Sequence, residues 1–435
     1  MANTSNAVLY GVFVLSGFMA STFLNHFGPR ITLIIAISGY PFFTGSMWYF
    51  DSHGHIWFPT VAGAYLGFSA GLLWTTAAFF SNGYSEEKDR GLWRAIQWTS
   101  NVGGATIGGC ISLGINWNAK SLGVPHSVYI IFICLQTASM GLAIFVLPSE
   151  RLRRSDGTAI AEYQHLPISQ SLMETLALLK DPVILLMIPA FFTPEMFFPL
   201  EASINAYAFN LRTRTLNAML GNAIQMPITF GYGWFLDNPR LGPRRRRALI
   251  GTCAVAIWVT GAYIAQTIWL NSWNFDRSVP GPSIDVKDQA YPGAIVIYLL
   301  MVSQYGIFQN TVIYIFGCIT NHPDKVARIA VISAGTCVSF ATDATAQPYM
   351  NENAAFFSLS MLCWPIMFFV TWKYAKDTQY FNEEGVVVPI HVRKEMVVSE
   401  GVDMASLGVA PVQSAEAKAV EAEAEGMSDI KRIGQ

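Results

Sequence analysis

Long apolar segments recur along the whole 435-residue chain, and they constrain its fold more than any other feature. A helix needs about 20 mainly apolar residues to cross a bilayer. Charged residues make up only 13% of the chain, against about a quarter in soluble domains. The sequence therefore predicts an all-α, multi-pass membrane protein. Eleven transmembrane helices are expected, at about 7–25, 31–50, 57–80, 93–115, 125–147, 182–203, 214–237, 248–270, 293–316, 326–347 and 353–375.

Two polar stretches divide the predicted spans into units. One lies at 148–181, between the fifth and sixth spans, and the other runs from Lys376 to the C-terminus. The last part of the tail is rich in Ala and Glu, a composition that is typical of disorder. We therefore expect an N-terminal half-bundle of five spans at 1–147, a central cytoplasmic loop at 148–181, a C-terminal half-bundle of six spans at 182–375 and a partly disordered cytoplasmic tail at 376–435.

Lysine and arginine are distributed unevenly over the loops between the predicted spans. One set of alternate loops carries Arg30, Lys88, Arg90, Arg151, Arg153, Arg154, Arg240, Arg244 to Arg247 and Lys325. The opposite set carries only Lys120, Arg212, Arg214, Arg277 and Lys287. Basic loops stay on the cytoplasmic side of a membrane, so the C-terminus should be cytoplasmic and the N-terminus outside. Which membrane the protein occupies does not follow from this pattern.

Two turns between predicted helices share a pattern. The first reads STFLNHFGPRITL from Ser21 to Leu33, and the second reads GWFLDNPRLGPRRRRAL from Gly233 to Leu249. Matching turns indicate a duplicated bundle, in which the five-span first half would lack a helix that precedes residue 1. The residues at equivalent or flanking positions are candidates for a cytoplasmic gating motif: Asn25, Gly28 and Arg30 in the first copy, and Gly233, Asp237 and Arg244 in the second.

These turns resemble the cytoplasmic loop motif of the major facilitator superfamily, roughly G-x-x-x-D-x-x-G-R-R. The second copy keeps the acid as Asp237, whereas the first has Asn25 in that place and Pro29 in place of the first Arg. Segments 62–109, 204–225 and 376–389 resemble the fungal type of its Unc-ninety-three-like branch. The resemblance implies a two-half bundle that usually has twelve spans, so this chain looks as if it lacks the first.

The resemblance leaves two functions open. It implies a secondary carrier of a small solute, which could be proton-coupled, or a regulatory or trafficking partner of another membrane protein, such as an ion channel, that moves no solute. The eleventh predicted span keeps only Ser333-Ala334-Gly335 and Asp343 of the branch's pattern. This departure and the altered first turn favour the second hypothesis to some degree.

Three carboxylates fall inside predicted spans: Glu195, Glu201 and Asp343. An ionisable group at the bilayer centre costs about 2.5–3.5 kcal/mol, so it usually serves a function. At about 1.5 Å per residue, Glu195 lies roughly 20 Å into its span, just past mid-membrane. Desolvation there favours its protonated form, as proton coupling requires. The alternative is a carboxyl that stays protonated, or pairs with a neighbouring hydroxyl or amide, and only packs helices. Glu201 and Asp343 lie near the outer surface, where a hydrated mouth is the favoured interpretation.

Prolines and polar faces point to the same region of the bundle. Pro194 directly precedes Glu195 and removes a backbone hydrogen bond, which membrane helices tolerate beside cavities or inside the protein. Other spans carry polar residues at helical spacing, which should face inward. The remaining candidates for a substrate or coupling site are Asn101, Gln225, Tyr305 and Gln309, with Trp74 beside a glycine stripe. For any one of the four polar residues, a simple interhelical hydrogen bond is at least as strong an interpretation, and Trp74 could equally belong to the packed core.

Other chemistry is not indicated. The chain contains no HExxH, no GxSxG beside a plausible triad, no Walker-type Gly-Lys-Ser and no CxxCH. We therefore expect no enzyme activity, no cofactor and no metal site. The net charge of −2 gives no general attraction to nucleic acid. The expected partners are membrane lipid, an unidentified small molecule and, under the second hypothesis, another membrane protein.

Overall fold

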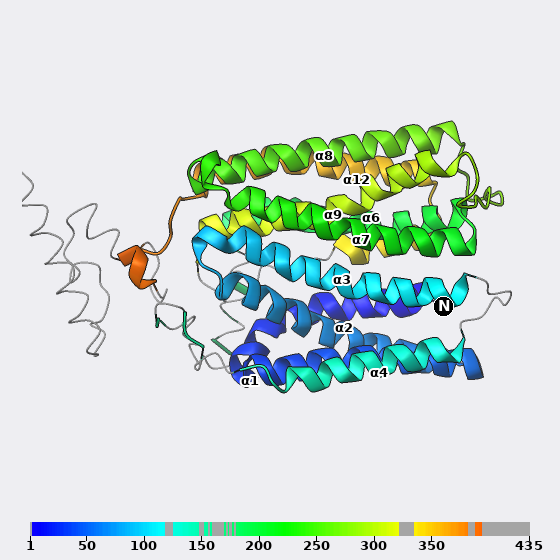
Figure 1. The fold of residues 1–435 in the computed structure, drawn as a ribbon, viewed down its shortest axis with the longest axis horizontal. Coiled ribbons are helices and arrows are strands. Elements are labelled where there is room, and N and C mark those ends of the chain that lie inside the picture. The colour runs from blue at the N-terminus through cyan, green and yellow to red at the C-terminus, as the bar shows by residue number, and fades with distance from the viewer. Residues whose placement is uncertain are drawn as a thin grey trace, which may run out of the picture.

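The computed structural model describes residues 2–117, 125–147, 180–321, 335–381 and 388–393, with short pieces between 152 and 177. Long helices run side by side through the molecule (Figure 1). Within the described residues, a helix occurs in every predicted span; of the span expected at 326–347 the structure describes 335–347, of which Gly335–Ala344 is helical. The predicted all-α class is confirmed. The bounds are α1 (Ala2–His53), α2 (Trp57–Ala78), α3 (Arg90–Asn116), α4 (His126–Ala143), α6 (Pro182–Ala208), α7 (Leu211–Asp237), α8 (Arg244–Ser272), α9 (Tyr291–Ile319), α11 (Gly335–Ala344) and α12 (Tyr349–Tyr374).

Short irregular helices lie at the ends of three of these. A π-helix at Phe79–Gly83 continues α2, and a 3-10 turn at Glu87–Asp89 leads into α3. A second 3-10 turn at Pro239–Leu241 follows α7. The expected central loop at 148–181, Ser333-Ala334 and most of the tail after residue 381 lie outside the described residues.

The element α1 consists of two helices that meet at Gly28. This glycine has φ 73° and ψ 168°, a conformation that side-chain-bearing residues avoid and glycine adopts without strain. Pro29 follows and has no amide hydrogen to donate, so the first helix cannot simply continue. Figure 1 shows the chain running to one end of the bundle and returning from there. The two spans predicted at 7–25 and 31–50 are therefore the two arms of α1.

Seven described helical segments are long and apolar enough to cross a membrane. They are Met19–His53, Trp57–Gly83, His126–Ala143, Pro182–Ala208, Arg244–Ser272, Tyr291–Ile319 and Tyr349–Tyr374. The spans predicted at 93–115 and 214–237 form α3 and α7, which are more polar. These two helices pack against each other in the middle of the molecule, so part of their polar surface faces protein.

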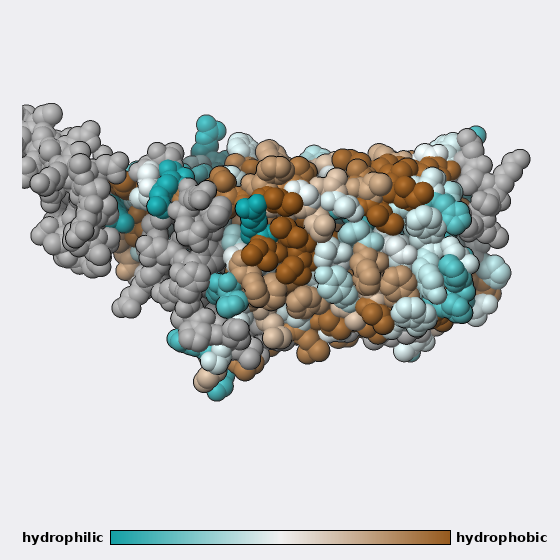
Figure 2. Space-filling view, turned by 90° about the horizontal axis from the view of Figure 1, so that it is seen from below, coloured by the Kyte–Doolittle hydropathy of each residue, from teal (hydrophilic) through white to brown (hydrophobic). Residues whose placement is uncertain are grey.

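The N-terminal helices (α1 to α4) and the C-terminal helices (α6 to α12) form two sets on opposite sides of the molecule (Figure 1). The sets meet where α3 of the first packs against α7 of the second. Glycines allow α3 and α7 to approach closely. A Cβ atom on Gly233 would lie 2.4 Å from the Cβ atom of Ala95, which a real side chain cannot do. Figure 2 shows apolar side chains spread over a face of the bundle. Large exposed apolar residues such as Leu142, Ile257 and Ile268 fit contact with lipid.

Candidate functional site: a central cavity and a contact at one end

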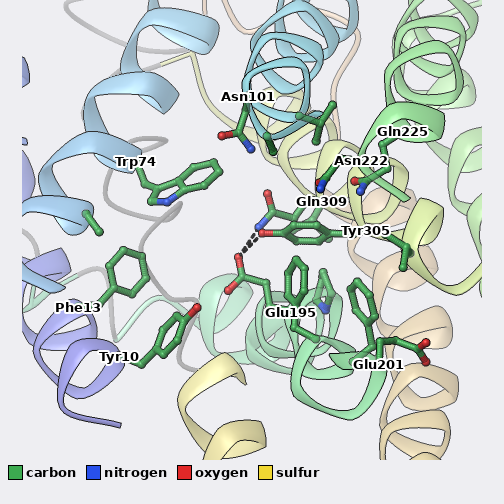
Figure 3. Close-up of a pocket in the computed structure, with 18 of the residues that line it drawn as sticks. Tyr10, Phe13, Trp74, Asn101, Glu195, Glu201, Asn222, Gln225, Tyr305 and Gln309 are labelled. Atoms are coloured by element: carbon green, nitrogen blue, oxygen red, sulfur yellow. Dashed lines mark hydrogen bonds between the residues drawn. The ribbon is translucent and has the colours of Figure 1, made fainter. Parts of the chain in front are cut away.

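A cavity of about 460 Å³ lies between the N-terminal and C-terminal helices (Figure 3). Its wall is mainly aromatic and aliphatic with a few polar groups, which is the usual character of a small-molecule site. The larger polar and aromatic side chains that line it include Tyr10, Phe13, Tyr40, Trp74, Arg94 and Asn101 from the N-terminal helices, and Glu195, Phe198, Glu201, Asn222, Gln225, Tyr305 and Gln309 from the C-terminal helices.

Glu195 reaches the cavity from α6, directly after Pro194, and two side chains of α9 hold its carboxylate (Figure 3). The hydroxyl of Tyr305 donates a hydrogen bond to Oε1 of Glu195 at 2.9 Å. Nε2 of Gln309 donates to the same oxygen at 2.8 Å. Tyr305 and Gln309 are four residues apart, so they share one face of α9. The structure thus brings together three residues that the sequence proposed for one site.

Arg94 completes this network, although the sequence analysis did not single it out. Its Nη2 atom donates to Oε1 of Gln309 at 3.1 Å, and its Nη1 atom contacts Oε1 of Gln97. Arg94 is only 4% exposed. Gln309 therefore links a guanidinium group of the N-terminal helices to the carboxylate of Glu195. An arginine one residue inside a predicted span was a signal that could have identified it.

Gln225 lies in the wall of the cavity and also joins the two sets of helices. Nε1 of Trp98 donates to Oε1 of Gln225 at 3.2 Å, and Nε2 of Gln225 donates to the carbonyl of Gly221 at 3.1 Å. Trp98 is fully buried and meets the ring of Tyr305 edge-on, with centroids 4.5 Å apart. Its ring centroid lies 6.2 Å from that of Trp74. This buried tryptophan positions two of the predicted site residues.

Asn101 and Asn222 give the cavity a polar rim. Figure 3 shows both on the side of the cavity opposite Glu195. Asn101 is exposed, and Nδ2 of Asn222 donates to the carbonyl of Ala218 on its own helix at 3.0 Å. The amides therefore extend the hydrogen-bonding surface that a small ligand would meet.

Asp343 lies elsewhere, and the described residues that line the cavity do not include it. Its carboxylate accepts hydrogen bonds from Oγ of Ser203 at 2.9 and 2.8 Å and pairs with Arg277 at 2.6 Å. Arg277 also contacts Glu352 at 3.1 Å. This cluster ties the loop after α8 to α6, α11 and α12. The structure therefore separates Asp343 from Glu195.

Within the described residues, no group of three or more His, Cys, Asp or Glu side chains could hold a metal ion.

The second copy of the repeated turn contacts α3. Oδ1 of Asp237 accepts a hydrogen bond from the amide of Gly91 at 3.1 Å, and Oδ2 accepts one from the amide of Leu92 at 2.6 Å. Asp237 thus caps the N-terminus of α3, where free amides and the helix dipole favour a negative charge. Gly233, one turn earlier, is the close-contact glycine against Ala95.

Arg244 forms a buried ion pair beside this cap. Its Nη1 atom lies 3.1 Å from Oε1 of Glu87, and the two side chains are 2% and 8% exposed. The same carboxylate oxygen accepts hydrogen bonds from Nδ2 of Asn321 and from the amide of Gln379. Arg90 donates to the carbonyl of Gly317 at 2.9 Å and to Oδ1 of Asn321 at 3.1 Å. We call the set Glu87, Arg90, Asp237, Arg244, Asn321 and Gln379 the tail-end cluster, because it lies at the end of the bundle from which the C-terminal tail leaves.

The first copy of the turn makes fewer contacts. Asn25 is 4% exposed, and neither atom of its amide has a hydrogen-bond partner among the described residues. Arg30 is exposed. Gly28 supplies the kink in α1. The two copies were predicted to act as one gating motif. In the structure, the second copy forms hydrogen bonds between the N-terminal and C-terminal helices through Asp237.

The arrangement of helices defines the class of protein. The solved structure of the proton:xylose symporter XylE, a member of the major facilitator superfamily, matches with a TM-score of 0.58 at 13% identity, over 86% of this chain and 86% of that chain. The protein is thus a multi-pass membrane protein with the major facilitator fold.

Relatives then identify the family. A family model described as "Ion channel regulatory protein UNC-93" matches residues 3–210. An uncharacterized membrane protein of Schizosaccharomyces pombe is 34% identical over 384 residues, which cover 87% of this chain and 78% of the relative. UNC93-like protein 1 of Arabidopsis thaliana is 28% identical over 385 residues, covering 86% and 83%. The chain belongs to the UNC-93 family.

Proposed function

We propose that the protein is a secondary carrier that binds a small solute in the central cavity, with Glu195 as the coupling carboxylate. The observation that supports this most directly is the chain of contacts from Arg94 through Gln309 to Glu195. It places opposite charges on the two sides of a cavity between the N-terminal and C-terminal helices. Charged groups inside a membrane protein are costly, and they commonly mark substrate or ion pathways.

The geometry suggests how binding would be coupled to movement. In alternating access, two half-bundles at 1–147 and 182–375 rock against each other around a site at mid-membrane. Nε2 of Gln309 donates to the carboxylate of Glu195. This hydrogen bond becomes weaker when Glu195 is protonated, or when a ligand binds to the carboxylate in place of Gln309. The link to Arg94 is then loosened, and the N-terminal helices are freed to move relative to the C-terminal helices.

The tail-end cluster fits the closed side of such a carrier. The excess of lysine and arginine in one set of loops supports a cytoplasmic position for the tail and the C-terminus. The ion pair between Glu87 and Arg244 and the cap by Asp237 hold the two sets of helices together on that side. In this proposal the structure represents a state that is closed to the cytoplasm.

Uptake into liposomes tests the coupling role of Glu195. Purified protein would be reconstituted and screened for uptake, driven by a pH gradient, of sugars, amino acids, organic anions and organic cations. We expect at least one solute to accumulate, and Glu195→Gln to lower its rate at least tenfold because the charge and one proton-binding group are lost. Asp276→Asn is the matched control, since Asp276 is an exposed carboxylate in the loop after α8. Uptake that is equally fast in Glu195→Gln would disprove the coupling role.

A regulatory role in complex with another membrane protein is the second candidate. The family description favours it, as does the buried amide of Asn25 in the first turn, which has no hydrogen-bond partner among the described residues. It predicts no uptake of any solute in the screen. It also predicts that the protein purified from native membranes in mild detergent carries another membrane protein in a fixed ratio, while Glu195→Gln leaves that ratio unchanged.

A further inference from the structure

We propose that Glu201 is a second proton-binding site, inside the C-terminal helices and distinct from Glu195. Glu201 lies six residues after Glu195 on α6, or about 9 Å further along the helix axis. Figure 3 shows the two carboxyl groups pointing in different directions from that helix. The proton site itself does not depend on transport. Only its use as a source of driving force rests on the function proposed above.

The carboxyl group of Glu201 is buried beside one polar side chain. The residue is 2% exposed, and among the described residues neither of its oxygens makes a hydrogen bond of good geometry, although the Gln266 amide is close enough to interact with it. Gln266 of α8 is the polar side chain beside it, and that amide is 0% exposed with both of its polar atoms also unsatisfied. Four buried polar atoms from two neighbouring side chains thus lack a hydrogen bond of good geometry among the described residues, which is rare in a native interior.

A proton resolves this deficit. A carboxylate accepts hydrogen bonds but cannot donate them, whereas a protonated carboxyl carries one O–H donor and one free carbonyl oxygen. The acid form of Glu201 can donate to Oε1 of Gln266 and accept from its Nε2. An ionised carboxylate in the same place would be buried without a counter-charge, which is strongly unfavourable.

The charged and titratable groups of the neighbouring helices do not supply that counter-charge. Tyr263 of α8 and Tyr298 of α9 lie close enough to Glu201 to interact with it electrostatically, but a tyrosine carries no positive charge. Asp343 of α11 and Glu352 of α12 both pair with Arg277. Within the part of the chain that the structure describes, no lysine or arginine forms an ion pair with Glu201.

The two carboxyl groups of α6 have different surroundings. Glu195 accepts two hydrogen bonds, and Gln309 links it to Arg94. Gln266 is the polar neighbour of Glu201. Because Glu201 also lines the cavity, a proton has a route to it. Glu201 would thus hold its proton at neutral pH.

Infrared difference spectroscopy tests this without any substrate. Wild-type protein in lipid would be titrated from neutral to alkaline pH, and the carbonyl stretch of a protonated carboxyl group would be followed. We expect a band at neutral pH that disappears on alkalinisation, is absent in Glu201→Gln and persists in Glu195→Gln and Asp276→Asn. A wild-type spectrum without such a band, or an unchanged band in Glu201→Gln, overturns the proposal. A protein that transports nothing would still show the band, so failure of the carrier hypothesis is distinguishable.

A second variant covers the case in which Glu201→Gln does not fold. Gln266→Leu keeps the carboxyl group and removes its neighbour, so the band should remain but shift in frequency. A band that is identical to that of wild type would overturn the pairing of Glu201 with Gln266. Replacing choline chloride with sodium chloride at neutral pH should also leave the band unchanged. Its loss on addition of sodium would show that the site takes a metal cation instead.

Discussion

The two ends of the bundle are held together in different ways. At the end where the tail leaves, Glu87, Arg90 and Arg244 join the N-terminal helices to the C-terminal helices through buried ionic and hydrogen-bonded contacts. At the opposite end, the hydrogen bonds and ion pairs that the structure describes stay within one set of helices. Examples are Arg277 with Asp343 and Arg212 with Asp285, both inside the C-terminal set.

The difference shows which end resists separation. Buried charges that lose their partner are costly, so the tail-end cluster opposes any movement that pulls the two sets of helices apart there. The ion pairs at the opposite end stabilise the C-terminal helices themselves, and Arg212 meets the N-terminal helices through the ring of Trp117, whose centroid is 5.8 Å from its guanidinium carbon. A variant in the tail-end cluster should therefore open the bundle at that end, whereas a variant at the opposite end should not.

The largest effect is expected from Glu87→Gln. This change leaves Arg90 and Arg244, which are 4% and 3% exposed, without the carboxylate between them, and removing one member of a buried pair costs about 3–5 kcal/mol. Cys318 is a natural reporter, because its side chain is fully buried and its carbonyl accepts a hydrogen bond from Nε2 of Gln379 at 3.2 Å. With the other five cysteines replaced by serine, a maleimide should label Cys318 faster in Glu87→Gln.

The control for this experiment is Asp285→Asn at the opposite end, which should leave the labelling of Cys318 at the wild-type rate. If both variants accelerate labelling equally, the loss of stability is general. The contrast between the two ends would then be wrong.

An intermediate effect is expected from Gly233→Ala. The new Cβ atom would lie 2.6 Å from the carbonyl oxygen of Gly91 as well as against Ala95, so α3 and α7 must move apart. Overpacking of this kind costs about 1–3 kcal/mol. Gly231→Ala is a matched control two residues away, since a Cβ atom there meets nothing within 4 Å. Thermal unfolding in detergent should show a lower midpoint for Gly233→Ala alone, and equal midpoints would contradict the close approach.

The smallest effect is expected from Asp285→Asn. The Arg212 guanidinium, followed by the Asn210 amide, holds the pKa of Asp285 well below its ordinary value. A depressed pKa stabilises the folded state above the unfolded pKa, and this contribution is lost as pH falls through the lower folded value. The contacts are partly exposed, so the difference in unfolding temperature from wild type should be small. It should persist from neutral pH down to about pH 4 and shrink only below that. A difference that vanishes by pH 6 would contradict the ion pair.

The sequence by itself determined the membrane character of the protein and most of the helix positions. Segment length and apolarity are local properties, and lipid enforces helices because backbone groups inside a bilayer must be satisfied internally. The turn at Gly28 was also readable, because glycine followed by proline interrupts a helix whatever surrounds it. Helical spacing correctly placed Tyr305 and Gln309 on one face of α9.

Only the tertiary structure decided which faces meet. Arg94 reaches Gln309 across 215 positions of sequence, and Trp98 reaches Gln225 across 127, because α3 packs along α7 and beside α9. The same packing sends Asp343 to Arg277 and leaves Glu201 beside Gln266. The periodicity of a helix fixes which residues share a face, but it cannot say which distant helix covers that face. That choice depends on the close fit of side chains between helices, and it separates three carboxylates of similar sequence context into three environments.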